Sequence, residues 1–517
     1  MPYRPVVLAI CDGWGFSRQS VGNAIFAAGT TNFDAIGKTY PSTLLQASGK
    51  SVGLDWGELG NSEVGHLSLG AGRIVLQYSA RIARAIETKT FFANETLERA
   101  TAHLQKTSGS LHLIGLLTSG TVHASFPLLI ALIDYAKQKN ITKLYLHLFG
   151  DGKDSGLKEA PELLAKVRKH IAESGVGVIA TFVGRNFSMD RDNNWDLTAQ
   201  AYALFTQGTG EKITDLEATL QSYYAKGTND NAIPPLVLDE KGIVKDGDAI
   251  VLFNFREDSI RQLGQMFAQE PFDRVPVKRP QNTFCALMTP YFDQEGLPVV
   301  FPAPSIKNNL AEFLSSQGLR QLHVAETQKY AHVTYFFNGL NNTPFPGEDD
   351  VLIESHKKAK EHPEMRAKEI ADTVVEALQT DEYDFIVLNF ANADILAHAG
   401  DLEGATKGAK LIDESIGRIR DAVLARNGIM IITSDHGNAE SLVYKSTGDI
   451  ETKHNANPVP FYLIAQEYAG QRTIDHLSET KGDSMGVLGD VAPTIVALMG
   501  LQKPPEMSGD SLLPRLF

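Results

Sequence analysis

Short apolar runs, each followed by polar residues, recur along the chain and predict the strands of parallel β-sheets. Three runs, at residues 5–10, Phe385–Phe390 and Ile429–Thr433, have the length and composition of strands that are buried on both faces. Ligands of open α/β sheets bind beyond the carboxyl ends of the strands. The polar residues that follow these three runs are therefore candidates for a functional site.

Each of the three runs is followed by an aspartate, namely Asp12, Asp394 and Asp435. His436 comes directly after Asp435, and His398 lies four residues after Asp394. Residues four apart lie on one face of a helix, so Asp394 and His398 can face the same point. Mixed carboxylate and imidazole ligands suit a divalent transition metal. We therefore predict a metal cluster at one edge of a sheet.

Four apolar runs between residues 110 and 260 are followed by a different set of polar residues. The runs are 111–117, 144–149, 176–183 and 249–253, and basic residues or histidine follow each of them. A single arginine is usually a solvated surface charge, but recurrence at four strand ends favours a binding site for an anion such as phosphate or carboxylate. The candidate residues are His123, Lys153, Asp154, Arg185, Arg191, Arg256 and Arg261.

Two segments predict linkers between domains. Residues 297–305 are rich in proline, and residues 72–79 mark the other boundary. A chain of 517 residues is also too long for one hydrophobic core. We expect two α/β domains: a discontinuous metal domain formed by residues 1–76 and 307–517, and an inserted domain formed by residues 77–306.

Composition restricts the class of protein. Hydrophobic residues make up 43% and charged residues 21%, as in ordinary globular enzymes, and the net charge of −14 argues against nucleic acid or an anionic membrane as partner. The two cysteines exclude a disulfide framework and fit a reducing compartment. No run approaches the ~20 apolar residues of a membrane span, and the N-terminus lacks the features of a signal peptide. We expect a soluble, cytoplasmic protein that is large enough to act as a monomer.

Ser62 and His454 extend the candidate metal ligands. Ser62 lies in a glycine-flanked segment, residues 60–66, in which a serine before glutamate would by itself favour a helix N-cap. The metal-binding strands favour a chemical role for it instead, because a bound cation makes a serine alkoxide accessible as a nucleophile for attack on phosphorus. Seven donors suit two adjacent cations: Asp12, Ser62, Asp394, His398, Asp435, His436 and His454.

The motifs that contain these residues resemble those of cofactor-independent phosphoglycerate mutases, the metal-dependent type within the alkaline phosphatase superfamily. They occur in the order of that family and span nearly the whole chain. The resemblance implies two three-layer α/β domains, an alkaline-phosphatase-like metal domain and an inserted substrate-binding domain. The motifs are CDGWG at 11–15, GNSEVGH at 60–66, GDGKDS at 150–155, GRNFSMDRDNNW at 184–195, FNFRED at 253–258, AETQKYAHVTYFFNG at 325–339, NFANADILAHAG at 389–400, TSDHGNAE at 433–440 and KHNANPVPF at 453–461.

The resemblance also implies a reaction and the role of each residue. Ser62 is expected to accept a phosphoryl group and form a phosphoserine, and Asp154 to shuttle the proton of the glycerate hydroxyl. The reaction is the interconversion of 3-phosphoglycerate and 2-phosphoglycerate, in glycolysis and gluconeogenesis, without 2,3-bisphosphoglycerate. One manganese ion is expected on Asp12, Ser62, Asp435 and His436, a second on Asp394, His398 and His454, and the phosphoglycerate on His123, Lys153, Arg185, Arg191, Arg256 and Lys329.

The sequence departs from the family pattern in several places. Lys153 and Ser259 stand where the family usually has arginine, and residues 230–232 and 341–360 differ as well. We expect Arg261, on the turn after Ser259, to replace the missing guanidinium. His66 has two interpretations, a residue near the metals or a structural histidine. His112 and His147 lie within apolar runs and are expected in the core.

Two other functions fit parts of this pattern. A metal-dependent phosphatase or a phosphopentomutase-like enzyme would share the metal-binding strands, but the basic strand ends favour the mutase. A catalytically inactive binding protein would be expected to have lost ligands, and all seven are present. The ligand set admits manganese, zinc or cobalt.

Overall fold

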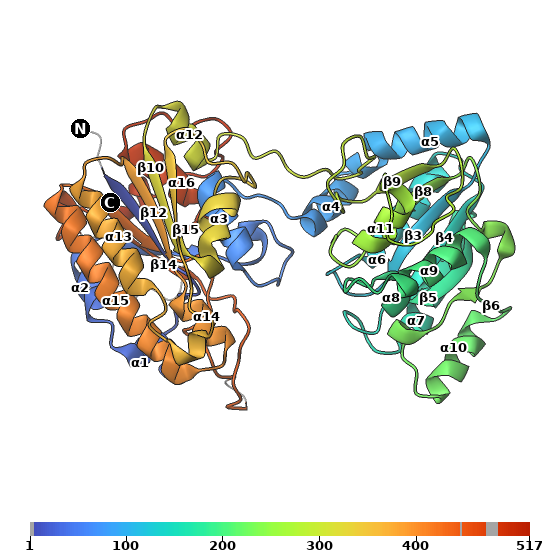
Figure 1. The fold of residues 1–517 in the computed structure, drawn as a ribbon, viewed down its shortest axis with the longest axis horizontal. Helices are drawn as coiled ribbons and strands as arrows, with labels where there is room; N and C mark the ends of the chain where they lie inside the picture. Colours follow the sequence, from blue (N-terminus) through green and yellow to red (C-terminus); the bar gives the residue numbers. More distant parts are fainter. Residues whose placement is uncertain (1–4, 445–446, 472–483) are drawn as a thin grey trace. The chain divides into compact units, whose positions relative to one another are not determined.

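The structure is a computed structural model that describes residues 5–444, 447–471 and 484–517. The chain forms two compact units, Met1–Leu76 with Pro304–Phe517, and Gln77–Ala303. Each unit is built on one mixed β-sheet with helices packed against it (Figure 1). The predicted α/β fold with two sheets is thus confirmed.

The first unit contains an eight-stranded sheet in the order β11-β10-β12-β1-β13-β14-β2-β15. The strands β1, β12 and β13 are the three apolar runs, and all their residues are buried. They pair in parallel with Val6 opposite both Phe385 and Ile429, so their carboxyl ends lie at one edge. The bounds are β1 Val6–Cys11, β2 Ser42–Gln46, β10 Gln321–Glu326, β11 Glu348–Ile353, β12 Phe385–Phe390, β13 Ile429–Thr433, β14 Val459–Ile464 and β15 Gly486–Val487.

Helices cover both faces of this sheet (Figure 1). Alternate residues of β1 enter two different cores: Val7 and Ala9 pack with α13 and α15, whereas Leu8 and Ile10 pack with α12 and α16. The period of two along a strand thus explains the three layers. The helices of this unit are α1 Ala24–Ala28, α2 Thr31–Thr39, α3 Ser62–Ala71, α12 Leu310–Ser316, α13 Ala367–Gln379, α14 Asn392–His398, α15 Leu402–Ala425, α16 Val491–Leu498 and α17 Leu513–Leu516.

The second unit contains a seven-stranded sheet in the order β6-β7-β5-β4-β3-β8-β9. The neighbouring strands β5, β4, β3, β8 and β9 are parallel to one another, and β7 is antiparallel to β5. The strands are β3 Leu111–Leu117, β4 Leu144–Gly150, β5 Val178–Gly184, β6 Glu211–Lys212, β7 Leu236–Val237, β8 Ala249–Leu252 and β9 Phe284–Leu287. The helices are α4 Tyr78–Glu87, α5 Glu95–Thr107, α6 Phe126–Gln138, α7 Ala160–Ser174, α8 Arg185–Ser188, α9 Trp195–Gln207, α10 Leu216–Ala225 and α11 Arg261–Ala268.

The first helical segment of the second unit is divided into two helices. It comprises α4, a short 3₁₀ turn at Thr90–Ala93 and the start of α5. Lys89 has a left-handed backbone with φ +62°, which ends the first helix. Asn94 begins the next helix because its side chain accepts hydrogen bonds from the amides of Thr96 and Leu97. Within the described part of the chain, no helix has the length and apolar character needed to cross a membrane.

Candidate metal centre and anion-binding site

The carboxyl edge of the first sheet brings the three aspartates together. Asp12 follows β1, Asp435 follows β13, and Asp394 lies on α14 directly after β12. Glycines permit the close approach of these segments: a Cβ at Gly13, which has φ +70°, would lie 2.8 Å from the Cβ of Asp394, and one at Gly65 would lie 2.6 Å from that of Asp435. Asp12, Asp394 and Asp435 are all buried.

Ser62 lies at the start of α3, beside this cluster. Its Oγ is 3.2 Å from Asp12 Oδ1 and 3.0 Å from His436 Nε2. The N-cap of α3 is Asn61, whose side chain accepts from the Val64 amide. The cap interpretation of Ser62 is therefore wrong, and its hydroxyl is directed at the aspartates and His436.

A second group consists of Asp394, His398 and His454. The Nε2 atoms of His398 and His454 each lie 3.3 Å from Asp394 Oδ1 and 2.8 Å from each other. Their Nδ1 atoms donate to the carbonyl oxygens of Thr452 and Gly60. In the neutral form of each ring, this arrangement leaves Nε2 unprotonated, as in histidines that bind metals.

Lys329 lies between the two groups. Its Nζ is 2.7 Å from Asp12 Oδ1, Ser62 Oγ and Asp394 Oδ2. Burial opposes the charge of Lys329, but Asp12, Asp394 and Asp435 outweigh it and raise the pKa of the ammonium above its ordinary value. Burial and then the nearby Asp435 raise the pKa of Asp12.

The donor set fits cations. Three buried carboxylates face a single ammonium group, that of Lys329, and neutral imidazoles add no positive charge. The cluster therefore has an excess of buried negative charge that bound cations would balance. Asp435 Oδ2 is buried and lies 3.3 Å from His66 Nδ1, but it accepts no hydrogen bond within the described residues. Three-residue groups drawn from these side chains, such as Asp394 with His398 and His454, have ligand atoms within 4.8 Å of one another. Carboxylates and imidazoles at such separations suit divalent transition metals.

Three further residues, Asn389, Asn438 and His66, support the cluster through hydrogen bonds, and the two asparagines were assigned no role from the sequence. Asn389 Nδ2 donates to Asp12 Oδ2 and to His66 Nε2, and Asn438 Nδ2 donates to Asp394 Oδ1. His66 donates its Nδ1 proton to the Ser62 carbonyl oxygen, 2.8 Å away, so both its nitrogens have protein partners. This geometry favours the structural interpretation of His66. Both asparagines belong to the family motifs quoted above, and this membership was the only indication in the sequence that they lie at the site.

The ends of β3, β4 and β5 in the second unit bring a separate set of residues together. Buried Asp151 accepts hydrogen bonds from Thr118 Oγ1, the amides of residues 153 and 154, and Arg185 NH1, which is 2.6 Å away. These bonds outweigh burial and lower the pKa of Asp151. Arg185 NH1 also lies 3.0 Å from Asp154 Oδ2, and His123 Nε2 lies 3.7 Å from the same oxygen.

Asp258 extends this network from the segment after β8. Its carboxylate lies 3.1 Å from Arg191 NH1, 3.3 Å from Arg256 Nε and 3.7 Å from His123 Nδ1. The side chains of Arg191 and Arg256 are 61% and 50% exposed, so both guanidinium groups can reach an external anion. Burial and the charge of Arg185 lower the pKa of His123.

The other candidates of this unit have different environments. Ser259, which replaces the usual arginine, places its Oγ 3.0 Å from His123 Nδ1. Arg261 is exposed, and its Nε donates to the Tyr291 carbonyl oxygen. Lys153 is also exposed. Over the described ranges, no hydrogen bond or ion pair joins the side chain of Lys153 or Arg261 to the His123–Asp154–Arg185 network. His112 and His147 are buried and hydrogen-bonded to each other, as expected of core groups.

Comparison with known proteins places the chain in a family. A family model described as the metalloenzyme superfamily matches residues 4–503. The chain is 42% identical to the 2,3-bisphosphoglycerate-independent phosphoglycerate mutase of Clostridioides difficile over the full length of both, and 44% identical to a Methanosarcina acetivorans enzyme of the same name over 99% and 98% of the two chains. A crystal structure of Leishmania mexicana phosphoglycerate mutase at low cobalt concentration matches 99% of this chain and 98% of its own, with a TM-score of 0.64 and 28% identity. The chain therefore belongs to the family of 2,3-bisphosphoglycerate-independent phosphoglycerate mutases, as its motifs predicted.

Proposed function

We propose that this chain is a metal-dependent phosphoglycerate mutase that interconverts 3-phosphoglycerate and 2-phosphoglycerate through a phosphoserine at Ser62, without 2,3-bisphosphoglycerate. The observation that carries the proposal is the position of the Ser62 hydroxyl, within 3.2 Å of Asp12, His436 and Lys329. Family membership supports the substrate class, since the relatives are named for this activity.

Two divalent cations, which we assign as manganese, would be held at the carboxyl edge of the first sheet. Asp12, Ser62, Asp435 and His436 would hold one of them, and Asp394, His398 and His454 the other. When bound, the cations supply Lewis-acid chemistry, which favours ionisation of a hydroxyl and disperses charge on a phosphoryl group. The mixed nitrogen and oxygen donors suit divalent transition metals in general, and manganese is what the resemblance to the family implies.

The residues of the chain itself supply the remaining functions at Ser62. Lys329 donates to Ser62 Oγ, so its ammonium stabilises negative charge at that oxygen and on an attached phosphoryl group. Burial of Ser62, Asp12, Asp435 and His436 limits access of water, which would otherwise hydrolyse a phosphoserine. We expect Lys329 to contact the phosphoryl group of the substrate for the same reason.

The second unit would bind the glycerate part of the substrate. In this proposal, residues 77–306 form the substrate domain, and residues 1–76 and 307–517 form the metal domain. Asp154 would accept and return the hydroxyl proton, supported by its contacts with His123 and Arg185. Exposed guanidinium groups offer bidentate donors for a carboxylate or phosphate. The proposed contacts are His123, Lys153, Asp154, Arg185, Arg191, Arg256 and Arg261. A monomeric, cytoplasmic enzyme remains our expectation.

A coupled assay for 2-phosphoglycerate tests the proposal. With 3-phosphoglycerate and Mn²⁺, the parent chain should form the isomer without added bisphosphate, and a chelator should abolish the reaction. Ser62→Ala should be inactive, whereas Ser68→Ala should not be. Ser68 is a matched control, because it lies on the same helix, is also buried and has an Oγ without a hydrogen-bond partner in the described structure.

The outcomes of this assay separate the alternative functions. Release of free phosphate in place of the isomer would indicate a phosphatase. Full mutase activity in Ser62→Ala would exclude Ser62 as the nucleophile. Activity that requires added bisphosphate would contradict the proposed mechanism.

A further inference from the structure

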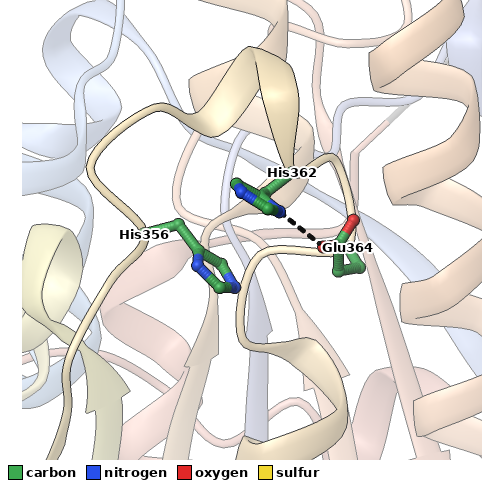
Figure 2. A group of neighbouring side chains, drawn as sticks. All are labelled: His356, His362 and Glu364. Carbon is green, nitrogen blue, oxygen red and sulfur yellow. Dashed lines mark hydrogen bonds and ion pairs between the residues drawn. The ribbon is translucent and has the colours of Figure 1, made fainter.

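A separate cluster of metal-ligating side chains lies in the loop between β11 and α13. It consists of His356, His362 and Glu364 (Figure 2), whose ligand atoms lie within 4.8 Å of one another. The two imidazole rings stack with centroids 4.2 Å apart and an interplanar angle of 18°. His362 Nδ1 lies 3.0 Å from Glu364 Oε1. None of these residues belongs to the centre around Ser62.

The chemistry of the cluster suits a zinc-type cation. Two imidazoles and one carboxylate form the ligand set of open zinc sites, in which water takes the fourth position. Manganese and magnesium prefer oxygen ligands, so a set with two nitrogens favours the borderline cations. The Asp394–His398–His454 group has the same types of ligand, so a count of bound ions and a measurement local to the loop are needed to tell the two sites apart.

Binding of one cation requires side-chain rotation, because the stacked rings must turn until the cation lies in the plane of both. Bonds of about 2.0–2.1 Å in a tetrahedral site place the ligand atoms roughly 3.4 Å apart, so the present separations must shorten by at most about 1.4 Å. The side chains of His362 and Glu364 are 46% and 53% exposed, and rotation about their χ angles meets little obstruction. Figure 2 shows the three side chains next to one another within the curled loop, with His362 between His356 and Glu364.

The backbone of the loop is fixed more firmly than its side chains. Asn392 Nδ2 donates to the carbonyl oxygens of Pro363 and Glu364, at 3.0 and 2.9 Å. Arg366 Nε donates to the Glu354 carbonyl oxygen at 2.7 Å, and the His362 amide to that of Ala359 at 3.0 Å. Because the backbone is already held in place, less conformational entropy is lost when a cation binds to the loop.

We propose that His356, His362 and Glu364 form an additional divalent-cation site, which prefers Zn²⁺ to Mn²⁺ and is distinct from the centre at Ser62. Asn392 is the first residue of α14, the helix that carries Asp394 and His398. A cation in the loop would therefore stiffen a segment that is hydrogen-bonded to that helix.

Zinc stoichiometry tests the proposal. The full chain is stripped with a chelator, dialysed against buffered free Zn²⁺, and its bound metal is counted by mass spectrometry. His356→Ala/His362→Ala should bind one zinc ion fewer per chain, or bind that ion at least about tenfold more weakly, since loss of even an outer partner costs ~10–100-fold in affinity. His170→Ala is the matched control, because it removes an imidazole that pairs with Asp134 in the second unit. Thermal unfolding by circular dichroism checks that all variants are folded.

A local measurement keeps the test specific to the loop. In the parent chain, Zn²⁺ should suppress acylation of His356 and His362 by diethyl pyrocarbonate, and Mn²⁺ at the same free concentration should not. Equal zinc stoichiometry and affinity in the parent and the double variant would overturn the proposal. Unchanged acylation of both histidines in the presence of Zn²⁺ would overturn it as well.

Discussion

The Nε2 atoms of His398 and His454 lie 2.8 Å apart, although the other nitrogen of each ring already donates its proton to a carbonyl oxygen. Two neutral imidazoles in this tautomer would direct lone pairs at each other, and both would direct them at Asp394 Oδ1. Such an arrangement is favourable only when a proton or a cation lies between the nitrogens. The chain therefore holds these rings in the orientation that a cation requires.

Replacement of His454 should remove one metal site and leave the other. His454→Ala should bind one Mn²⁺ fewer than the parent in equilibrium dialysis, and its kcat should fall on the order of 10²–10³-fold, the usual cost of losing one transition-state contact. His103→Ala is the control, since its imidazole hydrogen-bonds to Gly247 in the second unit. Equal Mn²⁺ stoichiometry in His454→Ala and the parent would contradict the assignment of this ligand.

Lys329 should act on both catalysis and stability. Lys329→Met should lower kcat on the order of 10²–10³-fold, because the ammonium beside Ser62 is lost. It also leaves Asp12 and Asp394 without their buried cation, so in chelator the free energy of unfolding should fall by about 3–5 kcal/mol. Urea unfolding with chelator and with Mn²⁺ measures this loss, and Mn²⁺ should restore most of it. An unchanged urea midpoint in chelator would show that Lys329 does not neutralise the aspartates.

Ser259 should orient His123 for the substrate. Its Oγ is 3.0 Å from His123 Nδ1, and one hydrogen bond contributes about 1 kcal/mol. Ser259→Ala should therefore raise the KM for phosphoglycerate by roughly fivefold, with a smaller effect on kcat. Ser259→Thr retains the hydroxyl and should restore the parent value. An unchanged KM in Ser259→Ala would mean that the position of His123 does not depend on this bond.

Arg261 tests an expectation that came from the sequence alone. If Arg261 replaces the guanidinium that Ser259 lacks, Arg261→Ala should raise KM or lower kcat, and Arg261→Lys should recover only part of the activity. The contact of its Nε with Tyr291 leaves the other nitrogens of the exposed guanidinium for an anion. Parent values of both constants in Arg261→Ala would exclude this compensation.

The strands and their tips could be predicted from the sequence for a simple reason. An apolar run is a local pattern, and parallel register brings the ends of β1, β12 and β13 to one edge, with Asp12, Asp394 and Asp435 beyond them. The position of Lys329 could not be predicted in the same way. Its contact with Ser62 joins positions 267 apart in sequence, and no local pattern reports which groups will meet. The same limit applies to Asn389, Asn438 and Asp258.

A buried acidic cluster on the edge of the first sheet should give the fold a distinct pH dependence. Asp350 lies on β11 beside His323 and Glu348, and these three residues have ligand atoms within 4.8 Å of one another. Burial raises the pKa of Asp350 from 3.8 to about 6, against the opposing effect of His323. Burial also lowers the pKa of His323 to about 4, so this ring is neutral near pH 7.

The sign of the effect follows from linkage. The folded state holds the Asp350 proton more tightly than the unfolded state does, so binding of this proton stabilises the folded protein. The stabilisation is fully present below pH 3.8 and is lost as the pH rises through about 6. Asp350→Asn removes the cost of the buried charge, so it should stabilise the protein at pH 8 by about 1 kcal/mol, after allowance for solvent screening of a half-buried group. Near pH 4 it should have little effect.

The neighbouring residue Asp349 provides the matched control. Asp349 lies on the same strand, but its carboxylate is about half exposed and pairs with Arg320 and Tyr383. Asp349→Asn should therefore destabilise the protein at pH 8 by roughly 0.2–1 kcal/mol, the opposite sign from Asp350→Asn. Urea unfolding of both variants and the parent at pH 4, 6 and 8 measures the difference. If Asp350→Asn is destabilising at pH 8, the carboxylate has a stabilising partner in the folded protein, and the pKa of Asp350 is not raised.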